Sequence, residues 1–215
     1  SGYRSRINND NTVATAGYYS TILEDYDILA ELTATTRAGF QRYTFPKGEN
    51  GRVLFDLKVA EEEPSKNIKA EIRKVSDTEI EGYVQREAGE WNEYTLHFAA
   101  RFNRPFKSMG GWIGTNILEN TDDIETSEDL DMGSFLEFDL GDDQVVLLKT
   151  AISYVSTEQA WLNLNTEMNP FEWDFDKARD NARNVWNTLL KKIKVEGGSE
   201  EDKLKFYTNL YRDYC

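Results

Sequence analysis

Residues 28 to 46 read ILAELTATTRAGFQRYTFP, and this stretch decides the fold of the first part of the chain. Successive side chains from Ile28 to Thr35 alternate between two sets, and a second alternating run from Phe40 to Phe45 follows a turn at Gly39. A period of two residues indicates a strand, because successive side chains point to opposite faces of a sheet. The stretch therefore predicts two paired strands, and they end at Pro46, which cannot donate a ladder hydrogen bond.

A third strand precedes this pair. The run from Tyr18 to Glu24 is rich in β-branched and aromatic residues, and only Asp25, Tyr26 and Asp27 separate it from Ile28. A connection of this length suits a hairpin loop. The sequence therefore predicts a three-stranded antiparallel meander.

Short runs with turn residues between them continue to residue 155. No helical crossover intervenes, so these runs predict a sandwich or barrel rather than a parallel sheet. We expect the last two strands to pair across the Gly141–Asp143 turn, the acidic residues 119–131 to form an exposed loop, and Gly110–Gly114 to form a bulge or turn. The further strands are predicted at Arg52–Leu57, Ile68–Val75, Glu79–Arg86, Tyr94–Phe102, Lys107–Ile113, Ser134–Leu140 and Gln144–Val155.

The period changes to a helical one at Ser156. Ser156 and Gln159 fit a capping box, Asp174 caps a second helix, and Ser199 with Asp202 begins a third. The third helix carries an apolar face, which we expect to be covered either by the sandwich or by a second copy of the chain. Its members are Leu204, Tyr207, Leu210, Tyr211 and Tyr214.

Composition excludes several classes of partner. The net charge of -14 would repel phosphate backbones and anionic membranes, so no nucleic acid is expected to bind. The sequence contains no run of 18 apolar residues, so no membrane-spanning helix is predicted. Cys215 is the only cysteine, so no internal disulfide is possible. Without an initiator methionine, the chain is expected to be a processed or excised piece.

Two blocks of sequence carry a resemblance to a known family. The words GYYSTILEDYDILAELTATTRAGFQRYTFP, from Gly17, resemble the N-terminal β-sandwich region of glycoside hydrolase family 92, the calcium-dependent exo-acting α-mannosidases. A second block, KTAISYVSTEQAWLNLNTE from Lys149 and WDFDKARDNARNVWNTLLKKIKVEGGSEEDKLKFYTNLY from Trp173, matches in the right order. Gln41 is a departure, because many members are expected to carry histidine there.

The resemblance implies a mainly β fold with a C-terminal helical segment. An antiparallel β-sandwich of the galactose-mutarotase-like supersandwich type, residues 1–155, would be incomplete at its N-terminus. About three α-helices in residues 156–215 would link it to an absent (α/α)6 catalytic domain. The implied enzyme hydrolyses α-linked mannose with inversion, uses calcium, and is periplasmic or secreted. Its catalytic residues and calcium ligands would lie outside this chain, which alone is expected to be inactive and to hold no calcium.

Candidate site residues are few. Trp91 and Trp112 are predicted in loops and are our candidates for stacking on substrate sugars, since a flat apolar ring matches the C–H side of a pyranose. His97 lacks a second ligand nearby and is expected to be structural. No catalytic residue is assigned, because 39 acidic residues offer pairs of carboxylates by chance throughout the chain. No metal-binding residue is assigned, because residues 119–131 and Glu61–Glu63 lack a calcium-loop spacing. Three tryptophans of the helical segment are expected to pack onto the sandwich or a neighbouring helix: Trp161, Trp173 and Trp186.

Partners follow from these interpretations. The resemblance implies mannose-containing glycans and the chain's own catalytic domain as partners, and the apolar face of the third helix allows a homo-oligomer. Two alternatives stay open, a stand-alone carbohydrate-binding module and a structural or interaction domain. Calorimetry with mannose and α-mannobiose distinguishes them, because only the former would bind sugar. Linkage preference and oligomeric state do not follow from the sequence.

Overall fold

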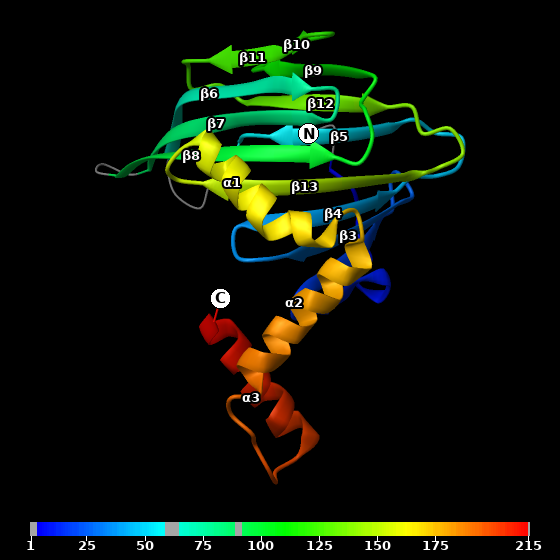
Figure 1. Cartoon of the computed structure of the whole chain (residues 1–215), viewed down its shortest axis with the longest axis vertical. Helices are drawn as coiled ribbons and strands as arrows, with labels where there is room; N and C mark the ends of the chain where they lie inside the picture. The colour runs from blue at the N-terminus through cyan, green and yellow to red at the C-terminus, as the bar shows by residue number, and fades with distance from the viewer. Residues whose placement is uncertain (1–3, 59–64, 89–91, 215) are drawn as a thin grey trace.

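The computed structural model describes residues 4–58, 65–88 and 92–214. In this described part, the strands form two facing antiparallel sheets, of nine and four strands, and three α-helices follow them (Figure 1). The large sheet has the order β1-β2-β3-β4-β13-β8-β7-β6-β11 and the small sheet the order β10-β9-β12-β5. The predicted antiparallel β-sandwich with C-terminal helices is therefore confirmed.

The large sheet takes strands from both ends of the β region. Its members are β1 (Val13–Thr15), β2 (Tyr18–Leu23), β3 (Ile28–Ala34), β4 (Ala38–Thr44), β6 (Ser65–Ser76), β7 (Glu79–Ala88), β8 (Asn92–Phe102), β11 (Asp123–Thr126) and β13 (Val145–Ser153). The small sheet consists of β5 (Gly51–Asp56), β9 (Ser108–Ile113), β10 (Asn116–Leu118) and β12 (Met132–Phe138). A short 3-10 turn, η1 (Asn9–Asn11), precedes β1.

The predicted meander is confirmed as β2, β3 and β4, but its second turn lies at residues 35–37, and Gly39 already belongs to β4. Tyr19 pairs with Leu32 across the first hairpin, and Glu31 pairs with Arg42 across the second. Asp27 has a φ of 51°, a left-handed conformation that aspartate tolerates better than most residues.

The predicted pairing of the last two strands is wrong. β12 lies between β9 and β5 in the small sheet, whereas β13 lies between β4 and β8 in the large one (Figure 1). Leu136 and Phe138 of β12 and Val146 and Leu148 of β13 belong to one core between the sheets. The two strands therefore face each other across that core, and the Gly141 turn crosses from one layer to the other.

The acidic segment is also not simply a loop. Within it, β11 pairs with β6, and Ile124 opposite Ile72 is only 1% exposed. Ile124 and Thr126 point inward while Asp123 and Glu125 point to solvent. A short edge strand needs only one inward apolar side chain. The low apolar content of residues 119–131 therefore did not exclude a strand, and the predicted exposed loop is wrong for Asp123–Thr126.

The glycine-rich segment is a strand rather than a bulge. Gly110 and Gly111 lie in the regular ladder of β9, and only Gly114, with a φ of 59°, forms the turn into β10. A Cβ on Gly111 would collide with the carbonyl of Gly133 and the side chain of Ile124. Glycine is required at Gly111 for close packing, and positive φ favours it at Gly114.

Helices cover the other face of the large sheet. They are α1 (Thr157–Met168), η2 (Asn169–Phe171) and α2 (Phe175–Leu190), and α1 lies across β8 and β13 (Figure 1). The change from strand to helix occurs at Ser156 as predicted, where the Ser156 hydroxyl accepts a hydrogen bond from the Gln159 amide at 3.1 Å. The Gln159 side chain donates to Asn163 instead of closing the capping box.

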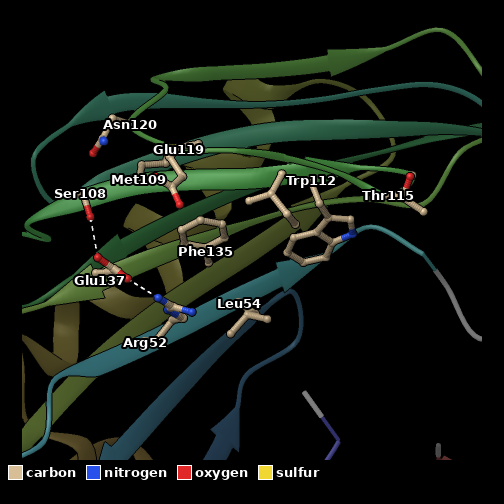
Figure 2. Close-up of a pocket in the computed structure, with 12 residues that line it drawn as sticks. Arg52, Leu54, Ser108, Met109, Trp112, Thr115, Glu119, Asn120, Phe135 and Glu137 are labelled. Atoms are coloured by element: carbon tan, nitrogen blue, oxygen red, sulfur yellow. Dashed lines mark hydrogen bonds and ion pairs between the residues drawn. The ribbon is translucent and has the colours of Figure 1, made fainter. Parts of the chain in front are cut away.

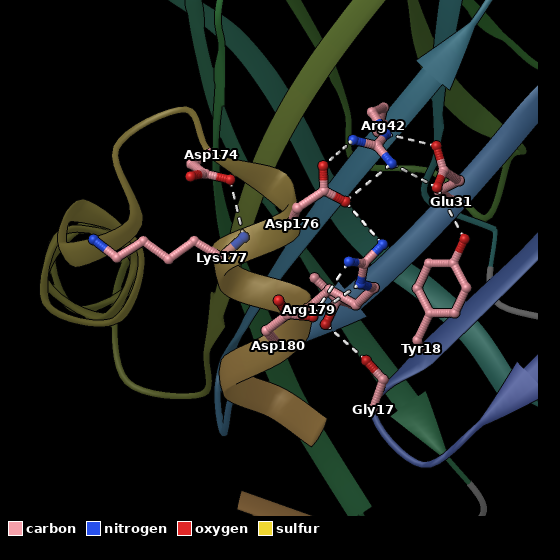
Figure 3. A network of polar contacts seen from close by, with 10 residues as sticks. Gly17, Tyr18, Glu31, Arg42, Asp174, Asp176, Lys177, Arg179 and Asp180 are labelled. Atoms are coloured by element: carbon pink, nitrogen blue, oxygen red, sulfur yellow. Dashed lines mark hydrogen bonds and ion pairs between the residues drawn. The ribbon is translucent and has the colours of Figure 1, made fainter. Parts of the chain in front are cut away.

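A charged network attaches α2 to the large sheet (Figure 3). Arg42 of β4 donates to both oxygens of Glu31, at 2.6 and 2.7 Å, and reaches Asp176 of α2 at 3.2 Å. Tyr18 donates to the same glutamate at 2.9 Å, and the Arg42 guanidinium lies 4.4 Å from the centre of the Phe175 ring. The start of α2 is therefore fixed on the sheet by both charge and aromatic contact.

The last helix, α3 (Glu200–Tyr214), does not fold back onto the sandwich, so that expectation is wrong. It lies against α2, away from both sheets (Figure 1), with Tyr211 and Trp186 centroids 4.6 Å apart. Leu204 and Tyr214 are 68% and 43% exposed. The long connection after Leu190 turns α3 back along α2, so the sandwich is out of reach. That a second copy of the chain covers the apolar face of α3 stays a prediction.

Within the described residues, no helix is long and apolar enough to cross a membrane.

Candidate functional site

The outer face of the small sheet carries the candidate site (Figure 2). Strand alternation sends Met109, Val53 and Leu136 into the core between the sheets. The alternate positions on the same three strands point outward, and among them are Trp112 on β9 and Phe135 on β12. The site is therefore built on paired strands, which hold side chains more rigidly than loops do.

Two glycines let the aromatic rings lie flat on this face. Gly133 pairs with Trp112, and a Cβ on Gly133 would collide with the indole ring. Gly110 pairs with Phe135, and a Cβ there would collide with the phenyl ring. Each ring thus lies over the glycine of the neighbouring strand. We call these two rings, Trp112 and Phe135, the aromatic platform.

An ordered charged pair borders the aromatic platform. Arg52 of β5 donates to one oxygen of Glu137, and the Ser108 hydroxyl donates to the other at 3.0 Å. The Arg52 guanidinium also lies 5.0 Å from the centre of the Phe135 ring. These two hydrogen bonds hold the pKa of Glu137 below its ordinary value. The bond from Arg52 has the larger effect and the bond from Ser108 the smaller. Glu137 is therefore an anionic acceptor in a fixed orientation at neutral pH.

The platform and the charged pair line one cavity of about 620 Å³. Apolar walls with a few fixed polar groups are typical of small-molecule sites of this size. The arrangement can stack a flat apolar surface and bond hydroxyl groups beside it. The cavity is lined by Arg52, Leu54, Ser108, Met109, Trp112, Gly114, Thr115, Ile117, Glu119, Asn120, Phe135 and Glu137.

Of the two predicted sugar-stacking residues, the structure places Trp112 in this cavity, and Trp91 lies outside the described residues. Trp112 lies in a strand and not in a loop, because the glycines before it are part of the ladder. Phe135, Glu137 and Arg52 also line this cavity, and none of them was predicted as a site residue from the sequence. The alternation of Gly133, Phe135 and Glu137 was the available signal that these three share one face.

The other predicted structural residues pack as expected. The His97 Nδ1 atom lies 3.1 Å from the Thr157 hydroxyl, at the start of α1. Trp161 donates to Glu81 of the large sheet, the Trp173 ring centre is 6.1 Å from that of Phe40, and Trp186 contacts α3. These side chains hold the helices in place.

The departure at Gln41 has a local explanation. Its amide oxygen accepts a hydrogen bond from Tyr43, and its amide nitrogen lies 3.4 Å from the Thr150 hydroxyl. Glu61–Glu63 lie outside the described residues. In the described ranges, no three or more His, Cys, Asp or Glu side chains form a group that suits a metal ion.

Comparison with known proteins identifies the family. The Glycosyl hydrolase family 92 N-terminal domain matches residues 1–153, and the Glycosyl hydrolase family 92 catalytic domain matches residues 159–215. A secreted glycosidase of Arthroderma benhamiae, itself uncharacterized, is 23% identical over 228 residues, which cover 94% of this chain and 28% of that protein.

Solved structures agree with these matches. A family GH92 α-mannosidase from Bacteroides thetaiotaomicron has a TM-score of 0.85 and 25% identity, covering 98% of this chain and 28% of its own. The family GH92 inverting mannosidase from Bacteroides thetaiotaomicron VPI-5482 has a TM-score of 0.84 and 25% identity, covering 97% of this chain and 27% of its own. This chain thus spans less than a third of the length of these relatives.

The sandwich, the helices behind it and these relatives define a chain of the glycoside hydrolase class. The chain belongs to glycosyl hydrolase family 92.

Proposed function

We propose that this chain is the N-terminal domain and first helices of an exo-acting α-mannosidase that removes α-linked mannose from glycans with inversion. One observation carries the proposal. The N-terminal and catalytic domains of the family match in order along the chain, and its fold follows that of an α-mannosidase over 98% of its length. The inverting mannosidase among the similar structures supports the stereochemistry.

The proposed division of labour follows from the same matches. Residues 1–155 form a sandwich domain, and residues 156–215 lead into an (α/α)6 catalytic domain on which the sandwich packs and whose active site it helps to shape. Inverting hydrolysis needs a general acid and a general base roughly 6.5–9.5 Å apart, with a water between the base and the sugar. We assign both to the catalytic domain.

We also propose that the whole enzyme uses calcium and is secreted or periplasmic. The description of the fungal relative as secreted supports the location. Calcium requires several oxygen ligands, and the described residues assemble no set of three or more carboxylate, histidine or cysteine side chains for a metal. We therefore look for the calcium ligands in the catalytic domain and derive no step through the ion.

The test is activity of the polypeptide encoded by the whole reading frame that contains this chain. We expect it to release mannose from an aryl α-mannoside, to give β-mannose as the first product by NMR, and to lose activity with a chelator. The 215-residue chain alone is expected to release none, with or without calcium. Calcium-dependent turnover by the short chain, or α-mannose as the first product of the long one, would contradict the proposal.

A second candidate function is favoured by the aromatic platform. A stand-alone carbohydrate-binding module would also present Trp112 and Phe135 on a sheet face beside fixed polar groups. It would bind sugars without any hydrolysis by the product of the whole reading frame, so the same assay separates it from the first proposal.

A further inference from the structure

A second hollow adjoins the candidate site along strand β5. It has a volume of about 710 Å³ and lies where the β2–β3 turn and the end of β4 approach β5. Arg52 and Leu54 line both this hollow and the cavity over the aromatic platform. The two hollows therefore meet at the outward side chains of β5. We call the pair the β5 groove.

We propose that the β5 groove binds a neutral oligosaccharide, with one sugar ring stacked on Trp112 and Phe135 and the next lying across β5 toward Tyr26. The choice of a mannose-containing ligand rests on the proposed function, whereas the groove itself is read from the geometry of the sandwich. In this binding mode Trp112 stacks on the sugar, and the site also contains Phe135, Arg52, Glu137 and Tyr26.

The shape of the groove suits a chain of sugar rings. The C–H face of a pyranose is flat and apolar, as the two rings of the platform are. Tyr26, 42% exposed, and the Phe45–Pro46 corner line the second hollow and offer further apolar surface at a distance from Trp112. Apolar surface at both ends and polar groups in the middle fit an oligosaccharide better than a single sugar.

The polar groups suit hydroxyls. Each carboxylate oxygen of Glu137 accepts one hydrogen bond, from Arg52 or Ser108, and a carboxylate offers about four lone-pair positions. Arg52 carries five N–H donors in a planar fork. In the described part of the chain its only hydrogen-bonded partner is Glu137. Neighbouring hydroxyls of one sugar can therefore bond both side chains at once.

The charge of the groove selects for neutral ligands. Arg52 is already paired with Glu137, so it does not offer an uncompensated positive charge. Four acids line the second hollow, and Glu119 lines the first, in a chain of net charge -14. An anionic sugar would be repelled, whereas a neutral one would not. The four acids are Glu24, Asp25, Asp27 and Glu49.

The test is NMR titration of the 215-residue chain, in which the indole N–H signal of Trp112 is assigned by substitution. We expect α-mannobiose and α-mannotriose to shift this signal, with mannotriose binding more tightly because it reaches the second hollow. Glucuronate is expected to bind at least roughly tenfold more weakly than α-mannobiose. Trp112→Ala lacks the reporter indole, so its affinity is measured by calorimetry. It should bind mannotriose roughly tenfold more weakly, which corresponds to a loss of about 1.4 kcal/mol of stacking energy.

A milder variant guards against loss of folding. Glu137→Gln keeps the size of the side chain and should weaken binding severalfold. Tyr154→Ala, at an exposed aromatic away from the groove, is the matched control and should bind as the parent does. Neutral sugars that leave the Trp112 signal unmoved at tens of millimolar, or that bind equally to the parent, Trp112→Ala and Glu137→Gln, overturn the proposal. These measurements record binding and not enzymatic activity. Their failure can therefore be distinguished from failure of the proposed function.

Discussion

Lys149 is a buried lysine at the junction of the large sheet and the helices. Its ammonium group donates to the backbone carbonyls of Met168, at 2.9 Å, and of Glu172. It also lies 5.0 and 4.6 Å from the ring centres of Phe40 and Trp173. Burial first, and the positive charge of Arg101 second, lower the pKa of Lys149 to about 8.

This lowered pKa predicts how stability changes with pH. Above pH 8 the folded protein loses the proton from Lys149, whereas the unfolded chain keeps it until about pH 10.5. Because the unfolded state then binds more protons, the free energy of unfolding rises with pH in this window. Relative to Lys149→Met, the parent should gain on the order of 1 kcal/mol between pH 7.5 and 9.5.

Urea denaturation at the two pH values measures this gain. Lys47→Met, at an exposed lysine, is the control and should show the same pH response as the parent. An equal response in Lys149→Met and the parent would show that Lys149 titrates normally.

Arg42 is the second residue on which the junction depends. Burial alone would raise the pKa of Glu31, but hydrogen bonds from Arg42 and Tyr18 outweigh it and hold this pKa below its ordinary value. The Glu31 side chain is 8% exposed and that of Arg42 24%. Glu31 is therefore a buried carboxylate that depends on its partner.

We predict that Arg42→Met lowers the free energy of unfolding by on the order of 3 kcal/mol, because it leaves this carboxylate unpaired. Adding Glu31→Gln should restore part of the loss. The difference from the parent should shrink as the pH falls, because the unpaired buried carboxylate of the variant takes up a proton above pH 4.5, whereas the parent loses its ion pair below pH 4.5. Arg179→Met, in a more exposed ion pair, is the control and should cost less than about 1 kcal/mol. A loss of the same size in both variants would contradict this account.

Among the three α-helices, α3 makes the fewest buried contacts with the rest of the chain. None of its described residues is buried. Its contacts to the rest of the chain include the Trp186–Tyr211 pair and a hydrogen bond from the Tyr207 hydroxyl to the Ile193 carbonyl at 3.1 Å. Few buried apolar contacts imply a small local free energy of opening.

We predict that Tyr207→Asp with Leu210→Asp detaches α3. Amide hydrogen exchange in α3 should become faster, exchange in the sheets should stay unchanged, and any dimer formed through α3 should dissociate in light scattering. The matched control is Thr208→Asp with Asn209→Asp, which adds the same charge on the exposed side. Unchanged exchange and unchanged mass in the first variant would show that the apolar face has no role.

For the whole molecule, an aromatic cluster joins the two sheets. Phe102 of the large sheet and Phe138 of the small sheet have ring centres 5.0 Å apart, and Phe106 lies 6.3 Å from both. Phe102 and Phe138 are 2% and 1% exposed. Because the cluster spans both layers, the two sheet faces that meet in this core stay buried only while both sheets are in place.

We predict that Phe138→Ala costs about 3–5 kcal/mol and that both sheets still unfold in one transition. The NMR signals of fluorinated tryptophan report on both sheets. Trp112 lies on the small sheet, and Trp161 lies on the helix-covered face of the large sheet. Their signals should disappear at the same urea concentration. Ile117→Ala, at a residue 64% exposed, should leave the midpoint unchanged. Separate midpoints for the two signals would show two independent units.

Local patterns in the sequence determined much of the fold. The meander of β2 to β4, the change of period at Ser156 and the helix start at Asp174 depend on neighbours within a few residues, and all three are confirmed. Two ordered blocks of resemblance, from Gly17 and from Lys149, were enough to identify the family.

Only the tertiary structure decided which strands pair and which side chains meet. β12 and β13 are neighbours in sequence but lie in different sheets, and Ile124 is buried because β11 pairs with β6 and its side chain packs in the core between the sheets. Trp112, Phe135 and Arg52 come from three strands separated by long connections, so their shared face depends on the pairing order β9-β12-β5. Alternation tells which residues of one strand share a face, but the register between distant strands is set by packing of the whole core.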